Sequence, residues 1–362
     1  MTVHAGANNK SAASALQPIA TTVAWRGDDS IPASEFSYVL SSAELAELEQ
    51  EGNRFLAVDP HLGTVNRDDF PLPVCAAGIA GWAEDLDQGR GFVVVRGLRV
   101  LEYSKELSGA IFFLLGLHLG APMRQNAAGD VLTHVIATTD KEAYDPTVLS
   151  SRTTGALTFH SDSSDVVGLL CLMGAAEGGA SLLASGATVY NEVVRRRPDL
   201  APLLFEPFHW DWYKQDFDAP AATYESPMCS LVDGVLSVYG GSKMVFTAQN
   251  YPDVPRLTEQ QREVLELVDE IASEPGIAQQ MDFQPGDIQW LLNYTAMHSR
   301  TAYRDHPEPD RRRHLLRLWL ERDVGRPIVD GFGKPVQQRQ GEPMDNPTIA
   351  ALVKTPQREG SN

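Results

Sequence analysis

Few cysteines and few basic residues occur in this chain, and each shortage argues against a class of protein. Its 362 residues include three cysteines, Cys75, Cys171 and Cys229, with no Cys-x-x-Cys pair. An odd number without that pair favours reduced thiols in a cytoplasmic protein over a disulfide framework. The 30 basic residues against 48 acidic ones give a net charge of −18. Such a surface disfavours nucleic acid and anionic membranes as partners, since phosphate binding needs basic side chains.

Long apolar runs are missing as well. The N-terminus has no basic segment followed by an apolar one, and no apolar stretch is long enough to span a bilayer, so we expect no signal peptide and no membrane anchor. Composition predicts a loose leader over residues 1–30, a single domain over 31–322 and an irregular tail over 323–362. No repeat or linker requires a second domain. The oligomeric state stays open, and a homo-oligomer is compatible with the sequence.

Helices are predicted mostly in the first third of the chain. Ser41 and Glu44 form a capping box ahead of a first helix, and the apolar spacing predicts further helices over residues 74–86, 104–119, 188–204 and 258–272. Short strands separated by turns are predicted over residues 92–95, 131–137, 166–173, 180–184, 208–213, 230–232, 235–239, 288–292 and 313–321. This order predicts an α+β protein with a mainly β core: a double-stranded β-helix, or jelly-roll barrel, with flanking helices.

A possible metal site centres on His160 and Asp162. In extended backbone, residues two apart point to the same face, so both side chains would reach one ion just before the buried strand 166–173. His298 comes at the end of another predicted strand, 138 residues later (298 minus 160). Two imidazoles and one carboxylate can occupy three adjacent corners of an octahedral metal and leave three corners for chemistry. Non-haem Fe(II) oxygenases use this arrangement.

A cluster of arginines follows His298 within 19 residues. Arg313 and Arg317 differ by four, so on a strand they share one face, which Trp319 also joins. A cosubstrate with two carboxylates needs one end on the metal and the other neutralised, and the arginine fork suits a buried carboxylate. The alternative is that these arginines pair with the plentiful surface acids.

Taken together and in order, these pieces resemble the TauD/TfdA family of Fe(II)- and 2-oxoglutarate-dependent dioxygenases, the clavaminate-synthase-like group. Singly each piece is common; together, over about residues 40–322, they are specific. The matching pieces are Gly91-Phe92-Val93-Val94-Val95-Arg96-Gly97, His160-Ser161-Asp162, Gly178-Gly179-Ala180-Ser181, Pro285-Gly286-Asp287, His298-Ser299-Arg300 and Arg313-His314-Leu315-Leu316-Arg317-Leu318-Trp319-Leu320.

The resemblance implies metal ligands and a cosubstrate site. His160, Asp162 and His298 would bind Fe(II), and Arg313 would bind the distal carboxylate of 2-oxoglutarate. Ser181 stands where the family usually has a threonine that hydrogen-bonds the same carboxylate, and serine keeps the hydroxyl.

The resemblance also implies substrate contacts. Arg317 would face the substrate, as in the taurine-type members, and Gln125 and Ser163 align with further contacts. The spacing from His298 to Arg313 is longer than in the taurine enzyme, so Arg317 stays an alternative partner for 2-oxoglutarate.

The implied reaction uses O2 and 2-oxoglutarate to hydroxylate an unactivated C–H bond of a small anionic or zwitterionic molecule, with release of succinate and CO2. Desaturation and cyclisation stay open. Two other classes compete: a non-catalytic jelly-roll protein that binds a small acid, and a metal-dependent hydrolase. The hydrolase motifs His-x-His-x-Asp-His and His-Glu-x-x-His are both missing.

Overall fold

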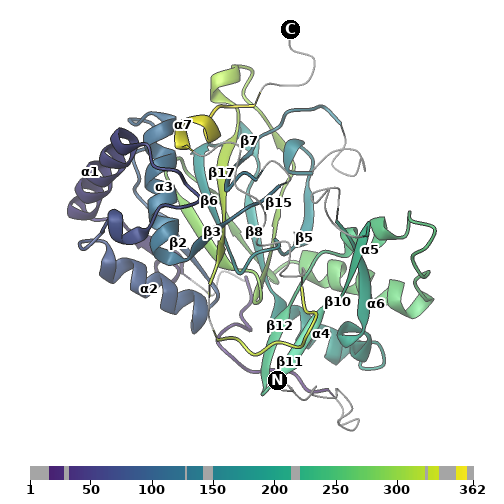
Figure 1. Ribbon diagram of the computed structural model, residues 1–362. Coiled ribbons are helices and arrows are strands. Elements are labelled where there is room, and N and C mark those ends of the chain that lie inside the picture. The colour runs from purple at the N-terminus through teal and green to yellow at the C-terminus, as the bar shows by residue number, and fades with distance from the viewer. Residues whose placement is uncertain are drawn as a thin grey trace, which may run out of the picture.

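Two sheets lie at the centre of the computed structural model (Figure 1), which describes residues 16–27, 32–126, 129–141, 150–212, 221–322, 325–333 and 348–356. The larger sheet has the order β1 (Ser37–Val39), β2 (Phe92–Arg96), β14 (Ile288–Leu292), β6 (Val166–Met173), β17 (His314–Glu321) and β3 (Ala121–Met123), with β4 (Leu132–Val135) also paired to β17. The smaller sheet has the order β13 (Ala278–Met281), β8 (Ser181–Ser185), β15 (Ala296–Arg300) and β5 (Leu157–His160).

The α+β class with a mainly β core is confirmed, with one refinement to the architecture. The described strands form separate sheets rather than one closed barrel. Pairing within the two main sheets is antiparallel except between β1 and β2, which run parallel. The double-stranded β-helix prediction therefore corresponds here to two separate, mainly antiparallel sheets with a shared apolar cluster between them.

Alternate residues of the central strands belong to two different cores. In β6, Leu170 and Leu172 pack toward the helices, whereas Leu169 and Cys171 belong to the cluster between the sheets. That inner cluster also includes Leu183 of the smaller sheet. Because both faces are buried, the strand reads as a continuous apolar run instead of an alternating one.

The helices α2 (Ala76–Asp87) and α3 (Lys105–Leu119) cover the outer face of the larger sheet, and α1 (Ser42–Val58) packs on α3. The predicted capping box is confirmed, with Ser41 and Glu44 each accepting from the other's backbone N–H. Ser104 caps α3 in the same way by accepting from the Leu107 N–H. None of the described helices is long and apolar enough to cross a bilayer.

The chain between β8 and β13 forms a second group of elements beside the smaller sheet (Figure 1). It comprises α4 (Gly186–Arg196), β9 (Pro207–Asp211), β10 (Thr223–Pro227), β11 (Cys229–Val232), β12 (Val235–Val238), α5 (Ser242–Ala248) and α6 (Glu259–Ser273). The predicted helix over 188–204 was too long. It ends at Arg196 because Pro198 disfavours helical backbone at the residue before it, and a 3₁₀ turn follows at Ala201–Phe205.

Residues on both sides of the predicted domain make defined contacts with it. Within the predicted leader, Ile19 donates its backbone N–H to Asn191 Oδ1 at 2.7 Å, and the Trp25 indole N–H donates to the Arg90 carbonyl at 2.9 Å. Within the predicted tail, α7 (Ile349–Leu352) packs on α3. The three cysteines are buried and unpaired, in agreement with reduced thiols.

The buried His314 and the partly buried His134 hold α7 against the edge of the larger sheet. His134 Nε2 lies 2.8 Å from the Leu352 carbonyl, and His134 Nδ1 lies 2.7 Å from His314 Nε2. A carbonyl only accepts, so His134 carries its proton on Nε2 and receives a hydrogen bond from His314 at Nδ1. Both rings are neutral in this arrangement, and protonation of His134 at Nδ1 would set two donors against each other.

We expect this pair to make folding stability depend on pH. Burial, with a smaller contribution from His134, Lys105 and Arg312, lowers the pKa of His314 to about 3. In the unfolded chain His314 binds a proton near pH 6.5, whereas in the folded chain it stays neutral until about pH 3. The free energy of unfolding therefore falls as the pH drops from about 6.5 toward 3, by up to about 1.4 kcal/mol per pH unit. Melting temperatures from pH 7 to 4 should fall less steeply in His314→Gln. An unchanged slope would contradict this, and His61→Gln serves as the control.

Candidate metal centre

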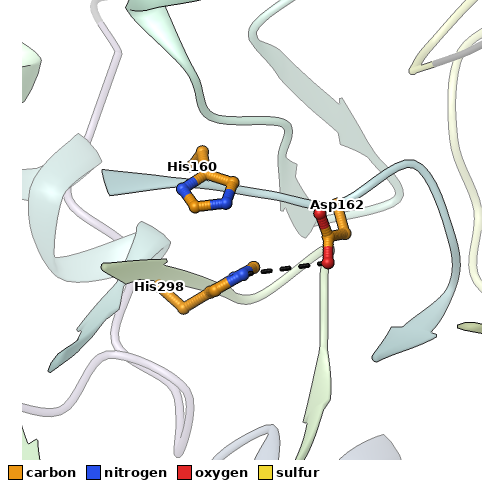
Figure 2. A group of neighbouring side chains, drawn as sticks. All are labelled: His160, Asp162 and His298. Atoms are coloured by element: carbon orange, nitrogen blue, oxygen red, sulfur yellow. Dashed lines mark ion pairs between the residues drawn. The ribbon is translucent and has the colours of Figure 1, made fainter. Parts of the chain in front are cut away.

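Strand pairing brings the two predicted histidine ligands together. His160 is the last residue of β5, His298 lies in β15, and the two are directly opposite each other in the antiparallel ladder. Residues opposite each other on paired strands point to the same face, and the ring centroids are 4.2 Å apart. Figure 2 shows both rings and the Asp162 carboxylate pointing toward a common space.

Asp162 is held at this space by its backbone. It lies in the loop between β5 and β6, where its N–H donates to Asn293 Oδ1 at 3.0 Å. The Asn293 amide in turn donates to the Ser164 carbonyl at 2.9 Å. This buried clamp holds the loop, so the carboxylate is positioned before any ion is bound.

The three side chains suit one metal ion. One ligand atom from each of His160, Asp162 and His298 lies within 4.8 Å of the others. His160 Nδ1 donates to the Thr158 carbonyl at 2.9 Å, which leaves the Nε2 lone pair free to bind. His298 Nε2 lies 3.8 Å from Asp162 Oδ2 (Figure 2). Two imidazoles and one carboxylate are a donor set suited to Fe(II).

Charges around the site keep the ligands in their metal-binding protonation states. Burial alone would raise the pKa of Asp162, but Arg317 and the two imidazoles outweigh it and hold that pKa below its ordinary value. Arg317 Nη1 lies 3.2 Å from Asp162 Oδ1, and the Trp319 indole N–H donates to Oδ2 at 2.9 Å. Burial, with His160 nearby, lowers the pKa of His298 to about 3. At neutral pH the carboxylate is therefore charged and His298 is neutral.

A second polar site contains two buried arginines. Arg300 and Arg313 are each 4% exposed, and both guanidinium groups lie over the Tyr303 ring, at 4.7 and 5.2 Å from its centroid. Arg313 Nη1 and Arg300 Nε and Nη1 have no hydrogen-bond partner among the described residues. Buried cations with unused donors are costly unless an anion is bound. The arrangement fits a carboxylate such as the distal group of 2-oxoglutarate.

The remaining predicted residues fall into three places. Gln125 Oε1 accepts from Arg317 Nε at 2.8 Å, so this residue does lie beside Arg317. Ser181 is opposite Arg300 in the β15–β8 ladder, and its hydroxyl donates to Gln289 Oε1 at 3.0 Å. Ser163 Oγ lies 3.2 Å from the Tyr239 hydroxyl, and no described contact joins it to the triad.

Sequence reasoning assigned no role to Arg300 or to Asn293. Arg300 follows His298 by two on one strand, and this even spacing could have identified a second inward-facing residue. Asn293 carries no such signal because its contact with Asp162 spans two distant segments. Trp319 was predicted to share the face of Arg317, but its hydrogen bond to Asp162 was not predicted.

The fold and the site define a class, the non-haem metal oxygenases with a facial triad on a double-stranded β-helix. Residues 55–319 match the model of the family "Taurine catabolism dioxygenase TauD, TfdA family". The chain belongs to this family, as its motifs predicted, and is an Fe(II)- and 2-oxoglutarate-dependent dioxygenase. The catalytic interpretation is thus supported over a binding protein without activity.

Relatives of established name are similar over most of their length. The chain is 28% identical to FR-33289 synthase of Streptomyces rubellomurinus over 321 residues, 86% of this chain and 92% of that protein. It is also 28% identical to the taurine hydroxylase-like protein SAT17 of Stachybotrys chartarum over 305 residues, 82% of this chain and 78% of that protein.

Solved structures support the same fold. An asparagine oxygenase in complex with Fe(II), 3-hydroxyasparagine and succinate superposes with a TM-score of 0.58 at 18% identity, covering 79% of this chain and 93% of that one. The non-haem iron oxygenase OrfP in complex with Fe and alpha-ketoglutaric acid superposes with a TM-score of 0.59 at 15% identity, covering 82% of this chain and 99% of that one.

Proposed function

We propose that His160, Asp162 and His298 bind Fe(II) in this enzyme and that Arg313 binds the distal carboxylate of 2-oxoglutarate. The grouping of these three side chains in one cluster is the observation that supports the metal assignment. When bound, the iron, 2-oxoglutarate and O2 supply the oxidising power that hydroxylates a substrate C–H bond and releases succinate and CO2. The chain's own contribution is to hold these groups in position and to keep the site free of bulk water.

The assignment of Arg313 rather than Arg317 follows from what each one touches. Arg317 contacts the Asp162 carboxylate and Gln125. Arg313 has a donor nitrogen without a partner among the described residues and lies with Arg300. 2-Oxoglutarate would chelate iron with its 2-oxo acid end, so its distal carboxylate belongs at a cation that is not engaged with a metal ligand. Ser181 lies opposite Arg300 and would add its hydroxyl there.

Arg317 and Gln125 then serve the substrate, with Ser163 as a more distant contact. A guanidinium beside the metal suits an acidic group on a small molecule. The named neighbours include an asparagine oxygenase and an oxygenase crystallised with hydroxy-L-Arg, so amino acids and related zwitterions are the first compounds to test. We further propose a cytoplasmic enzyme, in keeping with its buried free thiols.

The test is an anaerobic titration of metal-free protein with Fe(II) and 2-oxoglutarate, followed by the visible charge-transfer band of the chelate. We expect a band that saturates with one 2-oxoglutarate per chain and that is lost in His160→Ala. Iron binding without the band would reject the cosubstrate assignment. Binding of neither would leave a degenerate relative that binds only small acids.

A further inference from the structure

A pocket of about 270 Å³ lies beside Arg317, at the edge of the larger sheet. Its walls come from residues before, within and after β4, from the 3₁₀ turn Ser150–Arg152, and from the C-terminal segment 348–356. Its polar lining includes Gln125, Asp130, His134, Arg152, Arg317 and Lys354.

Arg317 joins this pocket to the metal centre. Its side chain lines the pocket and also contacts Asp162, while its Nε donates to Gln125 Oε1 at 2.8 Å. The Gln125 amide is fixed from its other side by donation to the Val131 and Arg317 carbonyls, at 2.7 and 2.8 Å. A ligand bound to Arg317 from the pocket would therefore be one side chain away from the proposed iron.

The pocket is cationic although the whole chain is strongly acidic. Arg152, Arg317 and Lys354 line it together with one acid, Asp130, and Arg317 is also paired with Asp162 at 3.2 Å. Asp130 Oδ2 accepts from Asn126 Nδ2 at 2.8 Å, and its Oδ1 has no hydrogen-bond partner among the described residues. The chain as a whole has a net charge of −18. The local excess of positive charge in this pocket therefore favours an anionic ligand.

The C-terminal wall is an anchored element. Ile349, Leu352 and Val353 are buried in the main core, and the Leu352 carbonyl is bound by His134. Lys105 Nζ donates to Thr355 Oγ1 at 2.7 Å. These contacts place Lys354 at the rim of the pocket. The segment also lies beyond residue 319, where the match to the family model ends.

We propose that residues 348–356 form the specificity wall of the substrate site and that the substrate carries two acidic groups, one bound by Arg317 near the metal and one by Lys354 at the rim. The inference rests on the proposed function, because it takes Arg317 as the substrate-facing arginine. It adds the substrate class, an elongated small dianion, and a binding residue, Lys354, beyond the residues that match the family model.

The test uses alkane-α,ω-disulfonates of two to four carbons, with the corresponding alkane monosulfonates as matched compounds. Sulfonates are fully charged and chelate iron weakly. Each is titrated calorimetrically into full-length protein loaded anaerobically with Fe(II) and 2-oxoglutarate, so that the cosubstrate site is already filled. The chelate band is recorded first, and its absence would reject the proposed function before any sulfonate is added.

We expect at least one disulfonate to bind about fivefold to tenfold more tightly than its monosulfonate, as one additional charged contact at a partly exposed site allows. That preference should vanish in Lys354→Gln and persist in Arg67→Gln, which removes an exposed charge that does not line this pocket. If no disulfonate is preferred, or if the preference survives in Lys354→Gln, the proposed specificity wall is wrong.

Discussion

Replacing Asp162 by alanine is expected to abolish stoichiometric Fe(II) binding and to lower 2-oxoglutarate turnover by about a thousandfold or more, because two imidazoles alone hold Fe(II) weakly. The substitution also leaves the Arg317 guanidinium and the Trp319 N–H without the carboxylate that both of them contact. Removing one partner of a buried charge pair costs about 3–5 kcal/mol of stability. Iron content, succinate release and the melting temperature should therefore be measured on the same preparation.

Two further variants separate loss of the ligand from loss of the fold. Asp162→Asn keeps an acceptor for Trp319 and the size of the side chain but removes the negative charge, so iron binding should still fail. Trp319→Phe removes one hydrogen bond to Asp162 and should retain iron. Stoichiometric iron together with near-normal turnover in Asp162→Asn would show that this carboxylate is not a ligand.

Arg313→Met is expected to weaken 2-oxoglutarate binding by about thirtyfold to a thousandfold, the loss that follows when a buried charge partner is removed. The sharper readout compares two cosubstrates. 2-Oxopentanoate lacks the distal carboxylate, so wild type and Arg313→Met should bind it with similar affinity. Dissociation constants come from the anaerobic chelate band, which reports binding without turnover.

Arg304→Met provides the matched control, because Arg304 is exposed, pairs with Glu177 and follows shortly after His298. It should leave both affinities unchanged. If Arg313→Met weakens the binding of 2-oxopentanoate as much as the binding of 2-oxoglutarate, Arg313 does not bind the distal carboxylate. If instead Arg317→Met weakens binding of 2-oxoglutarate but not of 2-oxopentanoate, Arg317 is the residue that binds the distal carboxylate.

The local parts of the site were predictable, and the long-range parts were not. The spacing of His160 and Asp162 indicated the pair, although Asp162 lies in the loop after β5 rather than on the strand, and even spacing indicated Arg313 and Arg317. The contact between Arg317 and Asp162 depends on how β17 lies beside β6, and that register shifts at a bulge between His314 and Leu315. No pattern within one strand encodes such a shift.

Short elements in polar segments could not be predicted from the sequence for a different reason. The helix α7 has four residues, too few to show a period. Its apolar residues Ile349, Leu352 and Val353 follow a stretch dominated by proline, glycine and glutamine. Their burial against α3 comes from tertiary packing, which commonly overrides weak local propensity.

The pairing of β5 with β15 also has a consequence for the folding of the enzyme during its synthesis. His160 and His298 face each other across the ladder although 138 residues separate them in the chain (298 minus 160). Contacts of such high sequence separation form late in folding, and domains acquire them only after much of the chain has emerged from the ribosome. The nascent protein thus has no complete iron site, and its capacity for oxidative chemistry begins only when the sheets that enclose that chemistry are in place.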